Sequence, residues 1–191
     1  EMYELLTMAN QTTEDVFSLL DNLLKWTKSQ IGKLKVVYQE LNMVEVVEGV
    51  SEIFTMVAGL KNIKIVQDMP VVPVVVRADI DMLKTVIRNL ISNAIKFSNE
   101  GSEVLVSLTE EDGMAIVSVK DSGCGIDEEN QKKLLHTDTH FSTFGTNNEE
   151  GSGLGLLLCQ DFIVKNGGKL WFTSKKGEGS TFSFSVPLLE K

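Results

Sequence analysis

Two glycine clusters, separated by a polar segment without clear periodicity, most strongly restrict how this chain can fold. The first cluster lies in Asp121–Ile126 and the second in Gly151–Leu156. A long irregular segment inside a compact domain is uncommon unless it has a function. Glycine permits sharp turns and lets backbone N–H groups approach a ligand closely. We therefore expect residues 127–150 to form a lid over a bound ligand.

Charge and cysteine content exclude several classes of protein. The chain has 191 residues, with 18 basic and 27 acidic side chains and a net charge of −9. This balance disfavours a nucleic-acid partner. No apolar run reaches the ~18–20 residues needed to span a bilayer, so no direct membrane contact is expected. The two cysteines, Cys124 and Cys159, indicate a reducing compartment. Together with only two histidines they do not make a zinc site, so none is expected. We expect Cys124 to be a small buried side chain.

The first 35 residues predict a long amphipathic helix. Leu20, Leu23, Leu24 and Ile31 fall on one stripe, and no Pro or Gly precedes Gly32. A helix of this kind at a chain end packs either on another copy or domain, or in the core of the main domain. We favour the first alternative. The predicted domains are therefore residues 1–35 and residues 36–191.

The main domain alternates between strand and helix patterns. Strands are expected at residues 36–40, 63–67, 74–77, 102–109, 114–120, 170–174 and 181–186. Helices are expected at residues 43–60, 80–97 and 153–165, with Asn42 and Asp79 as N-caps of the first two. The expected buried side of the first of these helices comprises Val46, Val47, Val50, Ile53, Phe54 and Val57.

The helix over residues 80–97 carries a polar stripe beside its apolar face. Asn89, Asn93 and Lys96 stand at i, i+4 and i+7 and so lie on one side of the helix. Two carboxamides and an ammonium suit a magnesium-bound phosphate chain, because the hard cation needs oxygen ligands and the phosphates need a cation. A solvated polar face is the alternative interpretation of this stripe.

Two further features indicate a nucleotide. Asp121 is expected at the end of a strand, where its carboxylate can accept a hydrogen bond from an exocyclic amine such as that of adenine; an ordinary turn Asp is the alternative. Gly151–Leu156 precedes a helix, and the unpaired N–H groups of a helix start favour phosphate. The spacing matches neither a P-loop nor the dinucleotide-binding fingerprint.

Taken in order, these segments resemble the ATP-binding domain of sensor histidine kinases. Asn89–Phe97 resembles their N box, Asp121–Gly125 the G1 box, Phe141–Phe144 the F box and Gly151–Leu156 the G2 box. Gly177–Phe182 is similar to their terminal glycine motif, and Asn22–Trp26 with Gly32–Leu34 to the second helix of their dimerisation hairpin. The implied fold is a two-layer α/β sandwich of the Bergerat type, with a mixed sheet packed on three helices, preceded by a long N-terminal helix.

The resemblance also implies roles for individual residues. Asn93 would ligate Mg²⁺, Asn89 would orient the phosphates or a metal-bound water, Lys96 would pair with phosphate oxygens and Phe97 would pack near the nucleoside. The adenine end of the ATP would be held by Asp121, Gly123, Gly125, Ile126 and Thr181. The phosphate loop and pocket lining would be Gly151, Gly153, Leu154, Gly155 and Leu156. Asn89, Asn93 and Lys96 would thus be the catalytic set, acting by placement and charge neutralisation.

The implied activity is that of a protein-histidine kinase within a longer chain. The acceptor histidine has no counterpart here, because His136 and His140 both fall in the lid and are expected to face solvent. We therefore expect a fragment that does not phosphorylate itself, from the cytoplasmic part of a membrane-bound receptor. Its implied partners are ATP, the dimerisation hairpin of the same receptor in a homodimer, and the receiver domain of a response regulator.

Two other functions remain open from the sequence. Thr143 and Gly145 depart from the usual F box, which leaves a degenerate, non-catalytic nucleotide-binding or docking module as the alternative. A chaperone or topoisomerase ATPase is disfavoured, since those relatives usually place a carboxylate base where this chain has Asn89.

Overall fold

The computed structural model describes residues 20–21, 23–29, 31–32, 34–132, 134, 146 and 154–189. The chain divides into two compact units, Glu1–Lys35 and Val36–Lys191. In the first unit, residues 20–21 and 23–29 are helical, and the side chains of Leu20, Leu24 and Ile31 are exposed. Among the described residues, no helix is both long enough and apolar enough to cross a bilayer.

A five-stranded mixed sheet forms one layer of the second unit. Its strands, in spatial order, are β2 (Lys64–Asp68), β4 (Glu103–Glu111), β5 (Met114–Asp121), β7 (Gly179–Pro187) and β6 (Leu170–Lys175). β2 runs parallel to β4, and the other neighbours are antiparallel. A separate antiparallel pair is formed by β1 (Gln39–Asn42) and β3 (Val75–Ala78).

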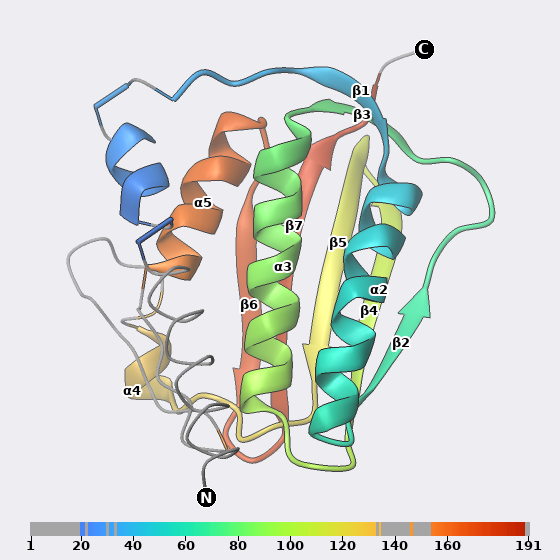
Figure 1. The fold of residues 1–191 in the computed structure, drawn as a ribbon, viewed down its shortest axis with the longest axis vertical. Coiled ribbons are helices and arrows are strands. Elements are labelled where there is room, and N and C mark those ends of the chain that lie inside the picture. Colours follow the sequence, from blue (N-terminus) through green and yellow to red (C-terminus); the bar gives the residue numbers. More distant parts are fainter. Residues whose placement is uncertain are drawn as a thin grey trace, which may run out of the picture. The chain divides into compact units, whose positions relative to one another are not determined.

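Three helices form the other layer, lying side by side on one face of the sheet (Figure 1). They are α2 (Met43–Leu60), α3 (Ile80–Phe97) and α5 (Gly155–Lys165); a short helix, α4 (Glu128–Gln131), follows β5. Alternate strand residues face the helices and are buried, among them Val104, Val106, Val117, Val119, Phe182 and Phe184. This arrangement confirms the predicted two-layer α/β sandwich with a mixed sheet on three helices.

Side-chain caps define where α2 and α3 begin, as the sequence predicts. Asn42 accepts a hydrogen bond from Val44 N at 3.2 Å. Asp79 Oδ1 accepts from Asp81 N at 3.0 Å and from Met82 N at 3.1 Å. Each cap satisfies backbone N–H groups that have no partner within the helix. The start of α3 therefore fixes the register of the polar stripe that follows.

The predicted buried side of α2 is partly wrong. Val46, Val47 and Val50 are buried, but Ile53 is 64% and Val57 49% exposed. The helix is apolar on more than one face, so its periodicity does not show which face the neighbouring elements cover.

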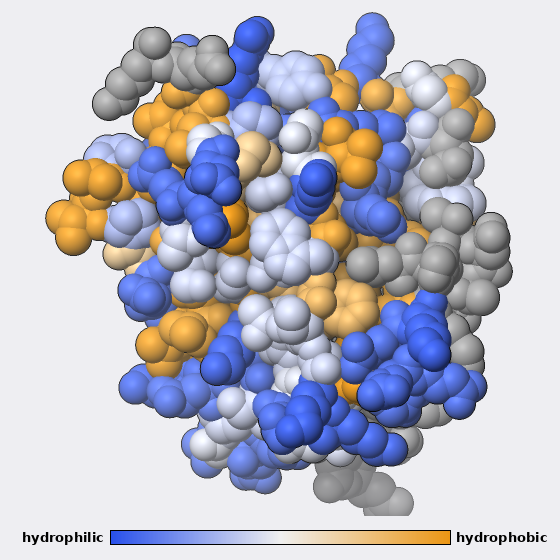
Figure 2. Space-filling view, turned by 180° about the vertical axis from the view of Figure 1, so that it is seen from behind, coloured by the Kyte–Doolittle hydropathy of each residue, from blue (hydrophilic) through white to orange (hydrophobic). Residues whose placement is uncertain are grey.

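Among the described residues, the opposite face of the sheet carries no helix (Figure 1), and Figure 2 shows polar and apolar side chains interspersed on that side of the molecule. The Oγ atoms of Ser118 and Ser183 lie 2.7 Å apart across β5 and β7. Thr181 pairs with Lys120 on β5 and Thr173 on β6, so these three residues share this helix-free face.

Candidate nucleotide-binding site

Asp121, the last residue of β5, lies at the base of the candidate site. Its side chain is 4% exposed, and Oδ1 accepts hydrogen bonds from Gly123 N at 2.9 Å and Ser180 N at 3.3 Å. Among the described residues, Oδ2 accepts none. Burial raises the pKa of this carboxyl, an effect that the two backbone N–H groups partly oppose. Oδ2 of this carboxylate is thus left for an external donor.

The loop after Asp121 is held between the end of α3 and the β6–β7 turn. A Cβ on Gly123 would lie 2.0 Å from Phe97 O, and one on Gly125 2.0 Å from Lys175 O. Gly125 also has φ +61°, a conformation that side chains disfavour. Cys124 N donates to Phe97 O at 3.2 Å, and Cys124 O accepts from Gly177 N at 2.8 Å. Only glycine therefore allows this close backbone packing at positions 123 and 125.

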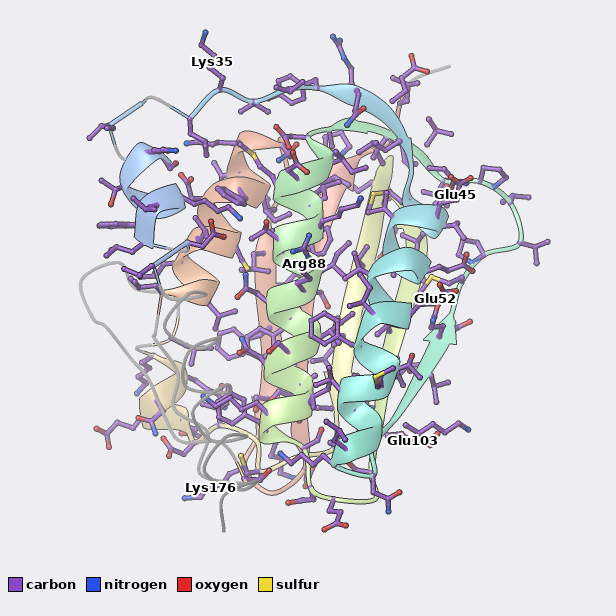
Figure 3. The ribbon with its side chains drawn as sticks, viewed as in Figure 1. Lys35, Glu45, Glu52, Arg88, Glu103 and Lys176 are labelled. Atoms are coloured by element: carbon purple, nitrogen blue, oxygen red, sulfur yellow. The ribbon has the colours of Figure 1, made fainter. Side chains whose placement is uncertain are left out.

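Figure 3 locates this end of the sheet: Glu103 begins β4 and Lys176 lies in the turn between β6 and β7. β5 ends at this same end of the sheet, since Val104 pairs with Asp121. The loop from Ser122 to Ile126 and the C-terminal end of α3 meet there. Segments far apart in the sequence thus converge at one end of the sheet.

The polar stripe of α3 lies next to the start of α5. Asn89 Nδ2 donates to Thr85 O at 2.9 Å, which turns Oδ1 away from its own helix backbone. A Cβ on Gly155 would come within 2.9 Å of that Oδ1. Asn93 and Lys96 are half-buried, and Lys96 Nζ lies 5.1 Å from the ring centroid of Phe97. The N-box amide and the last glycine of the second glycine cluster are therefore neighbours.

The remaining predicted residues are placed as follows. Leu154 is buried and Leu156 half-buried at the start of α5. Ile126 N donates to Ser174 Oγ at 2.8 Å, which fixes the end of the Asp121 loop to β6. Gly151, Gly153, the F box, and both histidines lie outside the described residues.

Two further residues are placed as follows. Thr181 is on the helix-free face of β7, away from Asp121, because side chains alternate along a strand. Ser180, which the sequence analysis missed, faces Asp121 instead, and its Oγ lies 2.9 Å from Ser174 Oγ. Strict alternation from the buried Phe182 would have identified it. Cys124 was expected to be buried but is exposed, because the loop fills its inner side with backbone contacts.

Comparison with known proteins identifies the family of this chain. Residues 78–190 match the family described as histidine kinase-, DNA gyrase B-, and HSP90-like ATPase. The adaptive-response sensory kinase SasA of Crocosphaera subtropica is 34% identical over 171 residues, which is 89% of this chain and 44% of SasA. The sensor histidine kinase WalK of Bacillus subtilis is 28% identical over 97% of this chain and 31% of WalK. This chain thus spans less than half of either relative.

A solved structure is also similar. The catalytic domain of histidine kinase ThkA superposes with a TM-score of 0.68 and 30% identity, covering 79% of this chain and 95% of that domain. The chain is a member of the histidine kinase-, DNA gyrase B-, and HSP90-like ATPase family, as the ATP-binding catalytic domain of a sensor histidine kinase.

Proposed function

We propose that this chain, as part of a longer protein, presents Mg-ATP for transfer of the γ-phosphoryl group to a histidine on a dimerisation hairpin. The observation that supports this most directly is the convergence described above. Asp121 lies beside the end of α3 through Gly123 and Phe97, and Asn89 lies beside the start of α5 through Gly155. One end of the site suits a base, and the other suits phosphates at a helix start.

Each side chain has a role that its surroundings support. Asp121 Oδ2 accepts a hydrogen bond from the exocyclic amine of adenine, with Ser180 and Ile126 at the edge of the base. Oxygens of Asn89 and Asn93 suit Mg²⁺, a hard cation that prefers oxygen ligands; the bond from Asn89 Nδ2 to Thr85 O leaves its oxygen directed at the site. Bound with ATP, Mg²⁺ supplies neutralisation of phosphate charge.

The other site residues complete the proposal. Lys96 pairs with phosphate oxygens and Phe97 packs on the nucleoside. The backbone of the second glycine cluster contacts the phosphates, with apolar side chains beside it; these residues are Gly151, Gly153, Leu154, Gly155 and Leu156. This chain's contribution is placement and electrostatic complementarity rather than covalent chemistry.

The rest of the signalling pathway lies in other parts of the longer protein and in its partners. We infer that residues 1–35 are the second helix of a dimerisation hairpin, since Leu20, Leu24 and Ile31 present an exposed apolar stripe for a homodimer partner. The phosphoryl group then passes to an aspartate of a response regulator; ThkA has been solved in complex with response regulator protein TrrA. The proposed location is the cytoplasmic side of a membrane receptor.

Calorimetric titration with ATP, with and without Mg²⁺, tests nucleotide binding. Asn93→Ala should weaken Mg-ATP binding about tenfold, as loss of one ligand oxygen in a polar site costs on the order of 1.4 kcal/mol. Arg88→Ala, an exposed change on the same helix (Figure 3), is the matched control and should leave affinity unchanged. Absence of any binding at millimolar Mg-ATP would contradict the proposal.

Phosphoryl transfer needs a chain extended upstream through the hairpin histidine. With γ-labelled ATP the extended chain should incorporate label, and residues 1–191 alone should not. Binding without labelling of the extended chain would favour the non-catalytic docking module instead.

A further inference from the structure

Lys61 places its charged end among backbone carbonyls in the interior of the protein. It follows α2 directly and is only 9% exposed. Its Nζ donates to Ile95 O at 3.0 Å, Lys96 O at 2.9 Å and Thr146 Oγ1 at 2.6 Å. An ammonium has three N–H donors, and at least three protein acceptors surround this one.

Two of these acceptors belong to the last turn of α3. The final carbonyls of a helix have no partner within it, and they form the negative end of its dipole. A buried cation is costly unless it is paired in this way. Lys61 is therefore a C-terminal cap for α3 that is supplied by the neighbouring helix, 34 residues before Ile95.

Thr146 strengthens the same contact. Its N–H donates to Lys96 O at 3.1 Å, and its hydroxyl donates to Ser98 O at 2.8 Å. The carbonyl of Lys96 thus accepts hydrogen bonds from both Lys61 and Thr146. On the next residue, Phe97 O accepts from Cys124 N in the Asp121 loop. The turn of α3 that carries Lys96 is fixed on both sides.

We propose that Lys61 is a positioning residue for nucleotide binding, which sets the place of Lys96 through the last turn of α3 without touching the nucleotide. This inference rests on the proposed function, in which Lys96 pairs with phosphate oxygens. Lys61 is not itself the phosphate contact in this proposal, since its Nζ already donates to Ile95 O, Lys96 O and Thr146 Oγ1.

A double-mutant cycle on the whole chain tests the proposal. Lys61→Met should weaken Mg-ATP binding about tenfold, because it removes the charge-assisted hydrogen bonds to the last turn of α3, which position Lys96 for the phosphates. In a Lys96→Met background the same change should cost less than about twofold, since the two residues act as one unit. Lys64→Met is the matched control: this lysine is exposed, 3.8 Å from Glu103 Oε1, and its loss should leave affinity unchanged.

The outcomes separate the hypotheses. If the unchanged chain binds no ATP, the proposed function fails. If it binds ATP and Lys61→Met has no effect, or an equal effect in both backgrounds, only the positioning role is overturned. If Lys61→Met does not fold, Thr146→Val decides, as it removes only the shared hydroxyl: affinity should fall about threefold, with Thr146→Ser close to the original chain. Unchanged affinity in Thr146→Val would then overturn the proposal.

Discussion

At the scale of single residues, the carboxylate of Asp121, which is proposed to bind the adenine amine, lowers the free energy of unfolding when it is ionised. Burial disfavours its charged form, while Gly123 N and Ser180 N favour it. Burial is the larger effect, so the folded protein holds the proton to a higher pH than the unfolded chain does. The same oxygen atoms that would recognise an amine therefore weaken the fold when they are ionised.

Asp121→Asn should change stability in a pH-dependent way. The stabilising contribution of protonated Asp121 is complete below its ordinary pKa of 3.8 and is lost as pH rises through the raised pKa of the folded state. The amide does not titrate. The unfolding free energy of the variant minus that of the original chain should thus increase from pH 4 to pH 7, as measured by thermal denaturation.

The same substitution should weaken ATP binding at least about tenfold, because an acceptor for the adenine amine is lost. Asp112→Asn is the control for both measurements. Asp112 lies in the exposed β4–β5 turn with φ +49°, a conformation that Asn tolerates. A pH-independent difference in stability between Asp121→Asn and the original chain would show that the two backbone hydrogen bonds cancel the effect of burial on the pKa.

Gly155→Ala tests the contact between α3 and α5. The added Cβ would lie 2.9 Å from Asn89 Oδ1, so the amide must move. A side-chain end moves cheaply, and we expect a small change in unfolding free energy but a loss of Mg-ATP affinity of about threefold or more. Gly49→Ala in α2 is the matched control, because its Cβ meets nothing within 4 Å. It should raise stability by about 0.5–1 kcal/mol and leave affinity unchanged.

At the scale of elements, one buried side chain joins the start of α3 to the end of α5. Asn166 Oδ1 accepts from Asp79 N at 2.8 Å, and Asn166 Nδ2 donates to Phe162 O at 2.7 Å. Asp79 in turn caps α3. The helix that carries the polar stripe and the helix that follows the second glycine cluster are therefore tied together at the end of the unit away from Lys61.

Asn166→Ala should lower the unfolding free energy by about 2 kcal/mol, because it leaves the buried Asp79 N–H and Phe162 carbonyl without this partner. Chemical denaturation with an unchanged m value measures the effect. Asn99→Ala, at an exposed position after α3, should stay within about 0.5 kcal/mol of the original chain. Equal denaturation midpoints for the two variants would show that the hydrogen bonds of Asn166 between α3 and α5 do not stabilise the fold.

Local patterns predicted the elements well because they act over a few residues. Alternating apolar positions gave the β4–β5 hairpin, and Asn42 and Asp79 gave the starts of α2 and α3. The resemblance pointed to Thr181, whereas alternation from Phe182 places Ser180 on the Asp121 side. Lys61 could not be found, since its role depends on how the end of α2 meets the end of α3, a tertiary contact without a local signal.

At the scale of the whole molecule, the second unit contains all the described residues of the candidate site. Val36–Lys191 includes the sheet, α2, α3 and α5. Its first residues are bound to helix ends: Val37 N donates to Asp79 Oδ2 at 2.8 Å, and Tyr38 OH donates to Lys165 O at 2.7 Å. The first contact is to the N-cap residue of α3, and the second is to the last residue of α5.

A chain that begins at Val36 should therefore fold and bind Mg-ATP within about twofold of the longer chain, with the same urea midpoint. A chain that begins at Leu41 loses the Val37 and Tyr38 contacts and half of β1, and its unfolding free energy should fall by about 1–3 kcal/mol. Comparing the two chains separates the contribution of the first unit from that of the segment that joins it to the second. A lower midpoint already in the chain from Val36 would mean that residues 1–35 stabilise the ATP-binding unit, because all the described contacts of that unit would still be present.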